Sequence, residues 1–274
     1  MNERLAACSW SFQPDSTAHL IECLGRAGLF RASLCLNPLV EDLSWSRAGA
    51  TLKDAGIELV SGMFMPIGED YSTLETIKLT GGIVPDEHWP ANRDLYARQV
   101  GIATALGLDQ ITFHAGFIPH DPNEPVRSKV TERLGELADL SRSAGIDLLL
   151  ETGQETAADL GGFLQALNHP AVGVNFDPAN MILYGKGDPI EAVKSLMHWV
   201  KQVHIKDALP TPQPGTWGSE ERVGSGAVDW PAFLNALQQG GYRGDLVIER
   251  EAGDQRVEDI AFAARHISER LAQA

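Results

Sequence analysis

The chain has 274 residues, a formal net charge of −15 at pH 7 and three cysteines. The excess of acidic residues argues against a nucleic-acid partner, because such a partner requires basic side chains to neutralise its phosphates. No apolar run approaches the roughly 18 residues of a membrane helix, so no membrane partner is expected. The odd cysteine count and the lack of a charged-then-apolar leader predict a reduced, cytoplasmic protein.

Short apolar segments alternate with longer amphipathic segments along nearly the whole chain. The short segments predict strands at 5–9, 31–36, 57–62, 109–114, 146–151, 171–176, 201–205 and 244–249. The longer segments predict helices at 16–28, 42–55, 91–107, 127–144, 156–167, 188–200, 229–240 and 255–272. Glycine closely follows several of these helices, as in LKDAGIEL and SRSAGIDL, which is typical of a helix that returns to a parallel strand.

Eight successive strand–helix units predict an α/β fold, a single (β/α)8 TIM barrel that takes up residues 1–274 as one domain. A doubly wound sheet is the alternative, but no glycine-rich turn follows the first strand. Two long loops, 63–90 and 206–228, come directly after the third and seventh strands. In a barrel both loops lie at the carboxyl ends of the strands, where barrel enzymes build their sites.

The last four predicted strands each end in a side chain that can bind a metal ion. The strand LLLE ends at Glu151, VGVNFD at Asp177, QVHI contains His204, and LVIE ends at Glu249. Taken alone, a carboxylate at a strand end is usually solvated, and a single histidine is usually structural. Neighbouring strands lie about 5 Å apart, however, and three carboxylates at that spacing repel one another unless a cation lies among them. The pattern therefore predicts one divalent metal ion.

The type of donor narrows the choice of ion. Carboxylate oxygens with a single imidazole suit Mn²⁺ best, and Mg²⁺, Co²⁺ and Zn²⁺ are the alternatives. No cysteine is expected near the four residues, so the sequence argues against a thiolate site.

The order Glu, Asp, His, Glu on strands five to eight, with FHAG ending the fourth strand and HIKDA after the seventh, resembles a known family. It is similar to the xylose-isomerase-like TIM-barrel superfamily of sugar phosphate isomerases and epimerases, which includes ketose 3-epimerases, hydroxypyruvate isomerase and inosose dehydratase. The resemblance covers essentially the whole chain. It implies that Glu151, Asp177, His204 and Glu249 are metal ligands and that Glu151 and Glu249 also act as the acid/base pair.

Two positions depart from the ketose 3-epimerases. Those enzymes usually place a substrate-binding histidine where this chain has Asn180, and an arginine where it has Pro210. Arg222 is the nearest replacement for that arginine, so Asn180 and Arg222 are predicted to bind substrate in their place. The departures weaken the specific assignment to ketose 3-epimerase. They do not change the prediction of the four metal ligands.

Three further residues are candidates for substrate binding. His114 ends the fourth strand, Lys206 shares a strand face with His204, and Trp10 follows the first strand. Structural packing is the alternative for His114 and Trp10. The segment RVGSG could hold an anion through its backbone amides, although flexible-loop glycines explain it as well. A non-phosphorylated sugar is therefore slightly favoured over a sugar phosphate.

These residues predict a divalent-metal-dependent sugar isomerase or epimerase. Proton transfer next to a carbonyl, through a metal-stabilised enediolate, would serve both reactions. Loss of a hydroxyl from the same intermediate would make the protein a dehydratase of inososes or keto-sugars. A metal-dependent phosphodiesterase and a non-catalytic sugar-binding protein are the remaining alternatives. The expected partner is a small sugar or keto-sugar, and the question of a homo-oligomer stays open.

Overall fold

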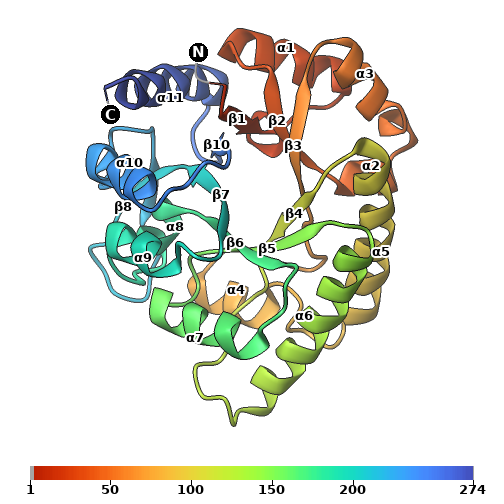
Figure 1. Cartoon of the computed structure of the whole chain (residues 1–274), viewed down its shortest axis with the longest axis vertical. Helices are drawn as coiled ribbons and strands as arrows, with labels where there is room; N and C mark the ends of the chain where they lie inside the picture. The colour runs from red at the N-terminus through yellow and green to blue at the C-terminus, as the bar shows by residue number, and fades with distance from the viewer. Residues whose placement is uncertain (1–2, 274) are drawn as a thin grey trace.

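The computed structural model describes residues 3–273 and shows a closed barrel of parallel strands surrounded by helices (Figure 1). The barrel strands are β1 (Leu5–Cys8), β2 (Arg31–Cys35), β3 (Glu58–Met63), β4 (Gln110–Phe113), β5 (Asp147–Glu151), β6 (Val172–Phe176), β7 (Val200–Ile205) and β10 (Leu246–Ile248). Parallel pairing of β1 with β10, with Ala6 opposite Val247, closes the ring. The predicted (β/α)8 TIM barrel is confirmed. The assignment of residues 1–274 to one domain stays a prediction.

The helices that cover the barrel lie within a few residues of their predicted positions. They are α1 (Thr17–Ala27), α3 (Ala48–Asp54), α5 (Trp89–Leu106), α6 (Pro125–Ser143), α7 (Ala157–Leu167), α9 (Pro189–Leu196), α10 (Trp230–Gln239) and α11 (Arg256–Leu271). The helix predicted at 42–55 is wrong in its first half. There the chain forms α2 (Asn37–Glu41) and the 3₁₀ turn η2 (Leu43–Trp45), because Asp42 is extended and its carboxylate accepts from the Ser44 amide.

Buried apolar residues form two separate clusters. The larger cluster lies between the barrel and its helices and includes Leu5 and Ala7 of β1. Ala6 and Cys8 belong to a small cluster with Val60 and Val247. Because side chains alternate along a strand, the small cluster faces the inside of the barrel. Its small size leaves room for polar side chains in the barrel interior.

Both long loops contain structure of their own. The loop after β3 contains α4 (Leu74–Thr80), and the loop after β7 contains the antiparallel pair β8 (Asp207–Leu209) and β9 (Ser219–Glu221). Gly82 has φ +64°, and a Cβ there would lie 2.1 Å from the backbone carbon of Ala115. Only glycine permits this contact, which packs the first long loop directly against the loop after β4.

Another short helix that was not predicted lies near the barrel mouth. Helix α8 (Pro178–Leu183) begins immediately after Asp177, whose Oδ1 accepts from the amides of Ala179 and Asn180. Among residues 3–273, no helix is long and apolar enough to cross a membrane.

Candidate metal centre and active site

The structure brings the four predicted ligand residues together at the carboxyl ends of β5, β6, β7 and β10. Nδ1 of His204 lies 3.4 Å from Oε1 of Glu151, 3.7 Å from Oδ2 of Asp177 and 3.5 Å from Oε2 of Glu249. One donor atom from each residue lies within 4.8 Å of the others, and all four residues are buried. We call Glu151, Asp177, His204 and Glu249 the four-residue cluster. Their role as metal ligands stays a prediction.

Two atoms of the four-residue cluster have unused hydrogen-bonding capacity. Oδ1 of Asp177 caps α8, which leaves Oδ2 directed towards His204. Within the described part of the chain, neither Oδ2 of Asp177 nor Nδ1 of His204 has a hydrogen-bond partner, although both atoms are buried. Buried polar atoms without partners are costly and uncommon in folded proteins. A cation among the carboxylates would satisfy both atoms, so these residues fit a divalent metal ion.

Burial and neighbouring charges act in opposite directions on the carboxylates. Burial raises the pKa of Asp177 above its ordinary value. Burial also opposes the charge of Glu249, but the Lys206 ammonium and His204 hold the pKa of Glu249 well below its usual range. The pKa of Glu151 is lowered because His114 and His204 together outweigh its burial. Both glutamates are therefore ionised at neutral pH and available to accept a proton or bind a cation.

Two of the predicted substrate residues contact Glu151. The Asn180 amide donates to Oε1 of Glu151 at 2.9 Å, and Nε2 of His114 lies 3.5 Å from the same oxygen. A third residue was missed. The side-chain nitrogen of Asn175 lies 3.4 Å from Oε2 of Glu151 and 3.0 Å from Nε2 of His204. Asn175 lies two positions before Asp177, so the period-two rule that selected Lys206 would also have found it.

Two other predicted substrate residues, Trp10 and Lys206, hold Glu249. The Trp10 indole donates to Oε1 at 2.6 Å, and the Lys206 ammonium donates to Oε2 at 2.8 Å. Lys206 also reaches Glu251, 2.7 Å away. Trp10 lies in the 3₁₀ turn η1 (Ser9–Phe12), directly after β1. Strand β1 pairs with β10, the strand that precedes Glu249, so the two side chains meet. Each glutamate of the cluster thus has its own set of donors.

Arg222 is not brought to the four-residue cluster. Its guanidinium carbon lies 4.2 Å from the centre of the Phe262 ring on α11, and its side chain is exposed. The amides of RVGSG are also engaged elsewhere. Those of Gly224 and Gly226 donate to the buried Asp207 carboxylate, which also accepts from the Trp230 indole. The anion held by this loop is therefore the protein's own carboxylate, and a substrate role for Arg222 stays a prediction that the geometry does not support.

The expectation that no cysteine lies near the cluster is wrong. Sγ of Cys8 lies 3.7 Å from Nε2 of His204, because β1 closes the barrel beside β10 and the alternation of β1 turns Cys8 inward. Burial raises the pKa of the Cys8 thiol far above its ordinary value, so the sulfur is a neutral neighbour and not a thiolate ligand.

The first long loop adds two residues that the sequence patterns did not indicate. Tyr71 donates from its hydroxyl to Glu69 at 3.3 Å, and its ring meets the edge of His114 with the ring centres 6.3 Å apart. The Gly82 amide donates to the other oxygen of Glu69 at 2.8 Å. Burial raises the pKa of Glu69. Glu69 and Tyr71 thus form one wall of the barrel mouth, and they come from a segment without a regular pattern.

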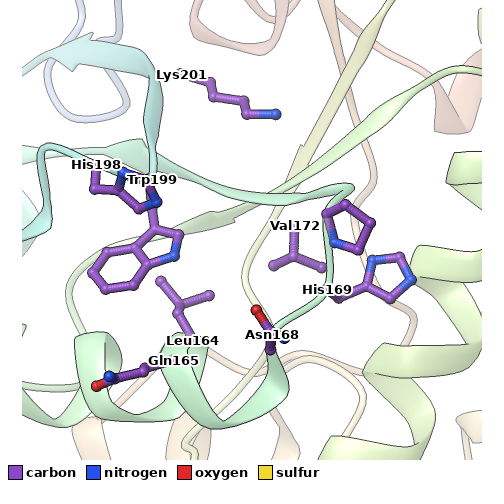
Figure 2. A pocket seen from close by; sticks show the side chains of 9 residues that line it. Leu164, Gln165, Asn168, His169, Val172, His198, Trp199 and Lys201 are labelled. Atoms are coloured by element: carbon purple, nitrogen blue, oxygen red, sulfur yellow. The ribbon is translucent and has the colours of Figure 1, made fainter.

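Two of the cavities outside the cluster lie at opposite ends of the barrel. One, of about 470 Å³, adjoins the barrel mouth and is lined by Phe117 and Tyr184 among others. The other, of about 770 Å³, lies where β6 and β7 begin, at the opposite end of the barrel (Figure 2). Two of its basic side chains already have acidic partners, Lys201 with Asp147 and His169 with Asp139. The four-residue cluster lies at the other end of the barrel from this cavity, where the strands have their carboxyl ends.

Comparison with known proteins agrees with the barrel fold. The family described as xylose isomerase-like TIM barrel matches residues 28–270. The chain is 22% identical to inosose dehydratase of Clostridium botulinum over 52% of this chain and 53% of that protein. It is 25% identical to L-ribulose-5-phosphate 3-epimerase of Salmonella typhi over 56% and 54%. The chain thus spans about half the length of these curated relatives.

Two solved structures are similar over nearly the whole chain. A xylose isomerase domain protein from Planctomyces limnophilus is 32% identical, with a TM-score of 0.87 over 92% of both chains. A xylose isomerase-like TIM barrel protein from Mycobacterium smegmatis, in complex with magnesium, is 19% identical, with a TM-score of 0.75 over 98% of this chain and 97% of that one. At 19% identity the second similarity concerns the fold alone.

Proposed function

The chain belongs to the xylose isomerase-like TIM barrel family, and from this premise we propose that it is a divalent-metal-dependent sugar isomerase or epimerase. One observation carries the proposal. Three carboxylates and one imidazole lie buried with their donor atoms within 4.8 Å of one another, and two of those atoms have no hydrogen-bond partner in the described chain. Such a donor set is costly to bury without a cation.

Glu151, Asp177, His204 and Glu249 would hold the ion. Their oxygen-rich set suits Mn²⁺ best, and Mg²⁺, Co²⁺ and Zn²⁺ remain alternatives. The magnesium complex of the relative from Mycobacterium smegmatis supports a divalent ion in this family. A bound ion would polarise a substrate carbonyl and stabilise the negative charge that remains when a neighbouring proton is removed.

The two glutamates are the proposed proton carriers. Glu151 and Glu249 come from strands on either side of β6 and β7, so a substrate at the mouth can present one face to each. Removal of a proton by one glutamate and its return by the other inverts a carbon, which is epimerisation. Return of the proton to the neighbouring carbon is aldose–ketose isomerisation. Lys206 and Trp10 orient Glu249, and Asn180 and His114 orient Glu151.

A non-phosphorylated sugar or keto-sugar is the proposed substrate. The glycine segment that could have held a phosphate donates its amides to Asp207 instead, and Arg222 packs on Phe262. The proposed substrate residues at the mouth are therefore the His114 imidazole, the Asn180 amide, the Trp10 ring and the Lys206 ammonium. These groups suit hydroxyl and carbonyl oxygens.

Dehydration of an inosose or keto-sugar is the second candidate. The match to inosose dehydratase favours it, and the same four-residue cluster would serve it. His114 lies close enough to Glu151 to share a substrate hydroxyl with it, so His114 is a candidate to protonate a departing hydroxyl. The cytoplasmic location expected from the sequence stays a prediction.

The experiment that tests these proposals is incubation of the purified protein with Mn²⁺ in D₂O and a panel of ketoses, keto-sugars and inososes. NMR then follows the signal of each C–H bond next to a carbonyl. An isomerase or epimerase exchanges that hydrogen for deuterium and conserves all hydroxyls, whereas a dehydratase releases water. A protein that binds Mn²⁺ and a sugar but exchanges no hydrogen would contradict both and indicate a non-catalytic binding protein.

A further inference from the structure

The imidazole of His204 has two environments. Nδ1 faces the three carboxylates of the four-residue cluster, and Nε2 faces the amide of Asn175 at 3.0 Å and the thiol of Cys8 at 3.7 Å. The side chain of His204 has no exposed surface, so water does not reach Nε2. Any hydrogen bond made by Nε2 must therefore involve Asn175 or Cys8.

A metal ion bound through Nδ1 sets a requirement at Nε2. A neutral imidazole carries one hydrogen, and a coordinating nitrogen must present its lone pair. When Nδ1 is the ligand, the single hydrogen of the neutral imidazole must lie on Nε2. That hydrogen needs a buried acceptor, and a thiol sulfur 3.7 Å away is a weak one. The amide of Asn175 is the better acceptor, provided that its oxygen faces the ring.

In the structure the amide of Asn175 faces the ring with its nitrogen, Nδ2. Its oxygen faces Gln202 instead, whose Nε2 lies 3.4 Å away. The other amide atom of Gln202, Oε1, is buried and has no hydrogen-bond partner among residues 3–273. A half turn of both amides about their terminal bonds would direct the Asn175 oxygen to His204 and its nitrogen to Oε1 of Gln202. The unpartnered oxygen would then be satisfied, while Nε2 of Gln202 would take its unpartnered position and the Asn175 nitrogen would give up its 3.4 Å contact with Oε2 of Glu151.

Strand register keeps these three residues together. Asn175 on β6 lies opposite Gln202 on β7 and opposite Glu151 on β5, and Gln202 lies two positions before His204 on the same strand face. Both amides are buried, at 0% and 1% exposure. Neither amide can therefore exchange its partners for water, so each must find them within the barrel.

We infer that Asn175 is the positioning residue of His204, that its amide oxygen accepts from Nε2 when Nδ1 binds a metal ion, and that Gln202 turns with it. The arrangement that binds the ion then has both buried amides rotated from the orientation that the structure shows. The inference rests on the proposed metal site. It adds the group that keeps the hydrogen of His204 on Nε2, which leaves Nδ1 free to bind the ion.

Mn²⁺ titration of the chelator-treated protein by calorimetry tests this role. Asn175→Leu has a similar volume but no acceptor, and it should weaken Mn²⁺ binding by about 10- to 100-fold, as is usual when a group that orients a ligand is lost. Asn175→Asp keeps an acceptor and should retain wild-type affinity or better. Gln202→Leu should weaken binding less than Asn175→Leu. Gln99→Leu removes another buried amide, on α5, and should leave Mn²⁺ affinity unchanged.

A measurement on the wild-type protein decides the question even if a variant fails to fold. In ¹⁵N-histidine-labelled protein loaded with diamagnetic Mg²⁺, His204 should carry its hydrogen on Nε2, with that signal assigned by its loss in His204→Gln. A hydrogen on Nδ1 in the Mg²⁺-bound protein, or wild-type Mn²⁺ affinity in Asn175→Leu, would overturn the role of Asn175. Failure of the wild type to bind any divalent ion would instead overturn the proposed function.

Discussion

The two glutamates of the four-residue cluster differ in what holds them. Glu249 accepts from a cation and an indole, whereas Glu151 accepts from a neutral amide and lies beside His114. A carboxylate paired with lysine is a weaker base than one paired with an amide. At the residue scale, the two proposed proton carriers are therefore chemically unequal carboxylates.

Replacing each glutamate by glutamine separates proton transfer from metal binding. Glu151→Gln and Glu249→Gln keep an oxygen ligand but remove the basic group, so kcat should fall by at least about 100-fold even at saturating Mn²⁺. Asp177→Asn is the matched control, because Asp177 is proposed only as a ligand, and high Mn²⁺ should restore its activity. One glutamine variant should still exchange the C–H of one epimer in D₂O without converting it. Full rescue of both glutamine variants by Mn²⁺ would reduce the glutamates to ligands.

Glu155 provides a pH prediction outside the cluster. Its buried carboxyl accepts from the Ile118 amide at 2.8 Å, and burial raises its pKa to about 7. Because this pKa lies above that of the unfolded chain, the folded state binds the proton more tightly. The free energy of unfolding should therefore decrease as pH rises from about 4.5 to 7, by at most about 3 kcal/mol, and level off above pH 7.

The measurement is urea denaturation of the wild type and Glu155→Gln at pH 5 and pH 8. Glutamine keeps the oxygen that accepts from Ile118 and cannot ionise, so the wild type should lose stability relative to the variant at the higher pH. Glu132→Gln on α6 changes an exposed side chain and should follow the wild type at both values. Parallel pH curves for wild type and Glu155→Gln would refute the assignment.

At the scale of elements, the mouth depends on how the two long loops are held. The first loop packs its backbone at Gly82 against the loop after β4, and it brings Glu69 and Tyr71 beside His114. The second loop folds around the Asp207 carboxylate, which accepts from four backbone amides and one indole. These contacts give the loops defined positions around the site.

Loss of the Asp207 carboxylate should loosen the second loop. Asp207→Asn exchanges one acceptor oxygen for a donor that would face backbone amides, so we expect faster proteolysis within 210–219 and a lower kcat/KM. Mn²⁺ affinity should change little, because Asp207 is not one of the four proposed ligands. Asp229→Asn removes a cap at the start of α10 and serves as the control for a general loss of stability. Equal proteolysis in both variants would show that Asp207 does not organise the loop.

At the scale of the whole molecule, the barrel joins its strands into a ring that places distant residues side by side. Trp10 and Glu249 are 239 positions apart in sequence, yet they share a 2.6 Å hydrogen bond because β1 closes against β10 (Figure 1). A ligand bound among β5, β6, β7 and β10 would therefore stabilise the ring as a unit. This links occupancy of the metal site to the stability of the fold.

Removal of metal should consequently lower both stability and activity. EDTA-treated protein should exchange no substrate hydrogen and should melt at a lower temperature than protein with Mn²⁺ or Co²⁺. At a metal concentration of 100 times Kd, the native state gains about 2.7 kcal/mol, which corresponds to several degrees in the melting temperature. Calorimetry with and without each ion measures the shift. No change on addition of any divalent ion would contradict the metal site.

The sequence by itself was enough to predict the barrel, because amphipathic helices and apolar strands repeat locally and a parallel sheet with short crossovers has few ways to close. It was also enough to select Glu151, Asp177, His204 and Glu249 as neighbours, since the carboxyl ends of barrel strands meet at one rim. Helix α8 and the break at Asp42 escaped prediction because a single side chain that caps a helix end decides each of them.

Only the tertiary structure showed which partners each side chain meets. Asn175 and Cys8 lie against His204 because strand register and closure of the ring place them there, and no local pattern encodes ring closure. The packing of Arg222 on Phe262 and the donation of the glycine amides to Asp207 are also contacts between residues distant in sequence. Side-chain partners of this kind depend on distances across the folded molecule, whereas periodicity and spacing report only on neighbours along the chain.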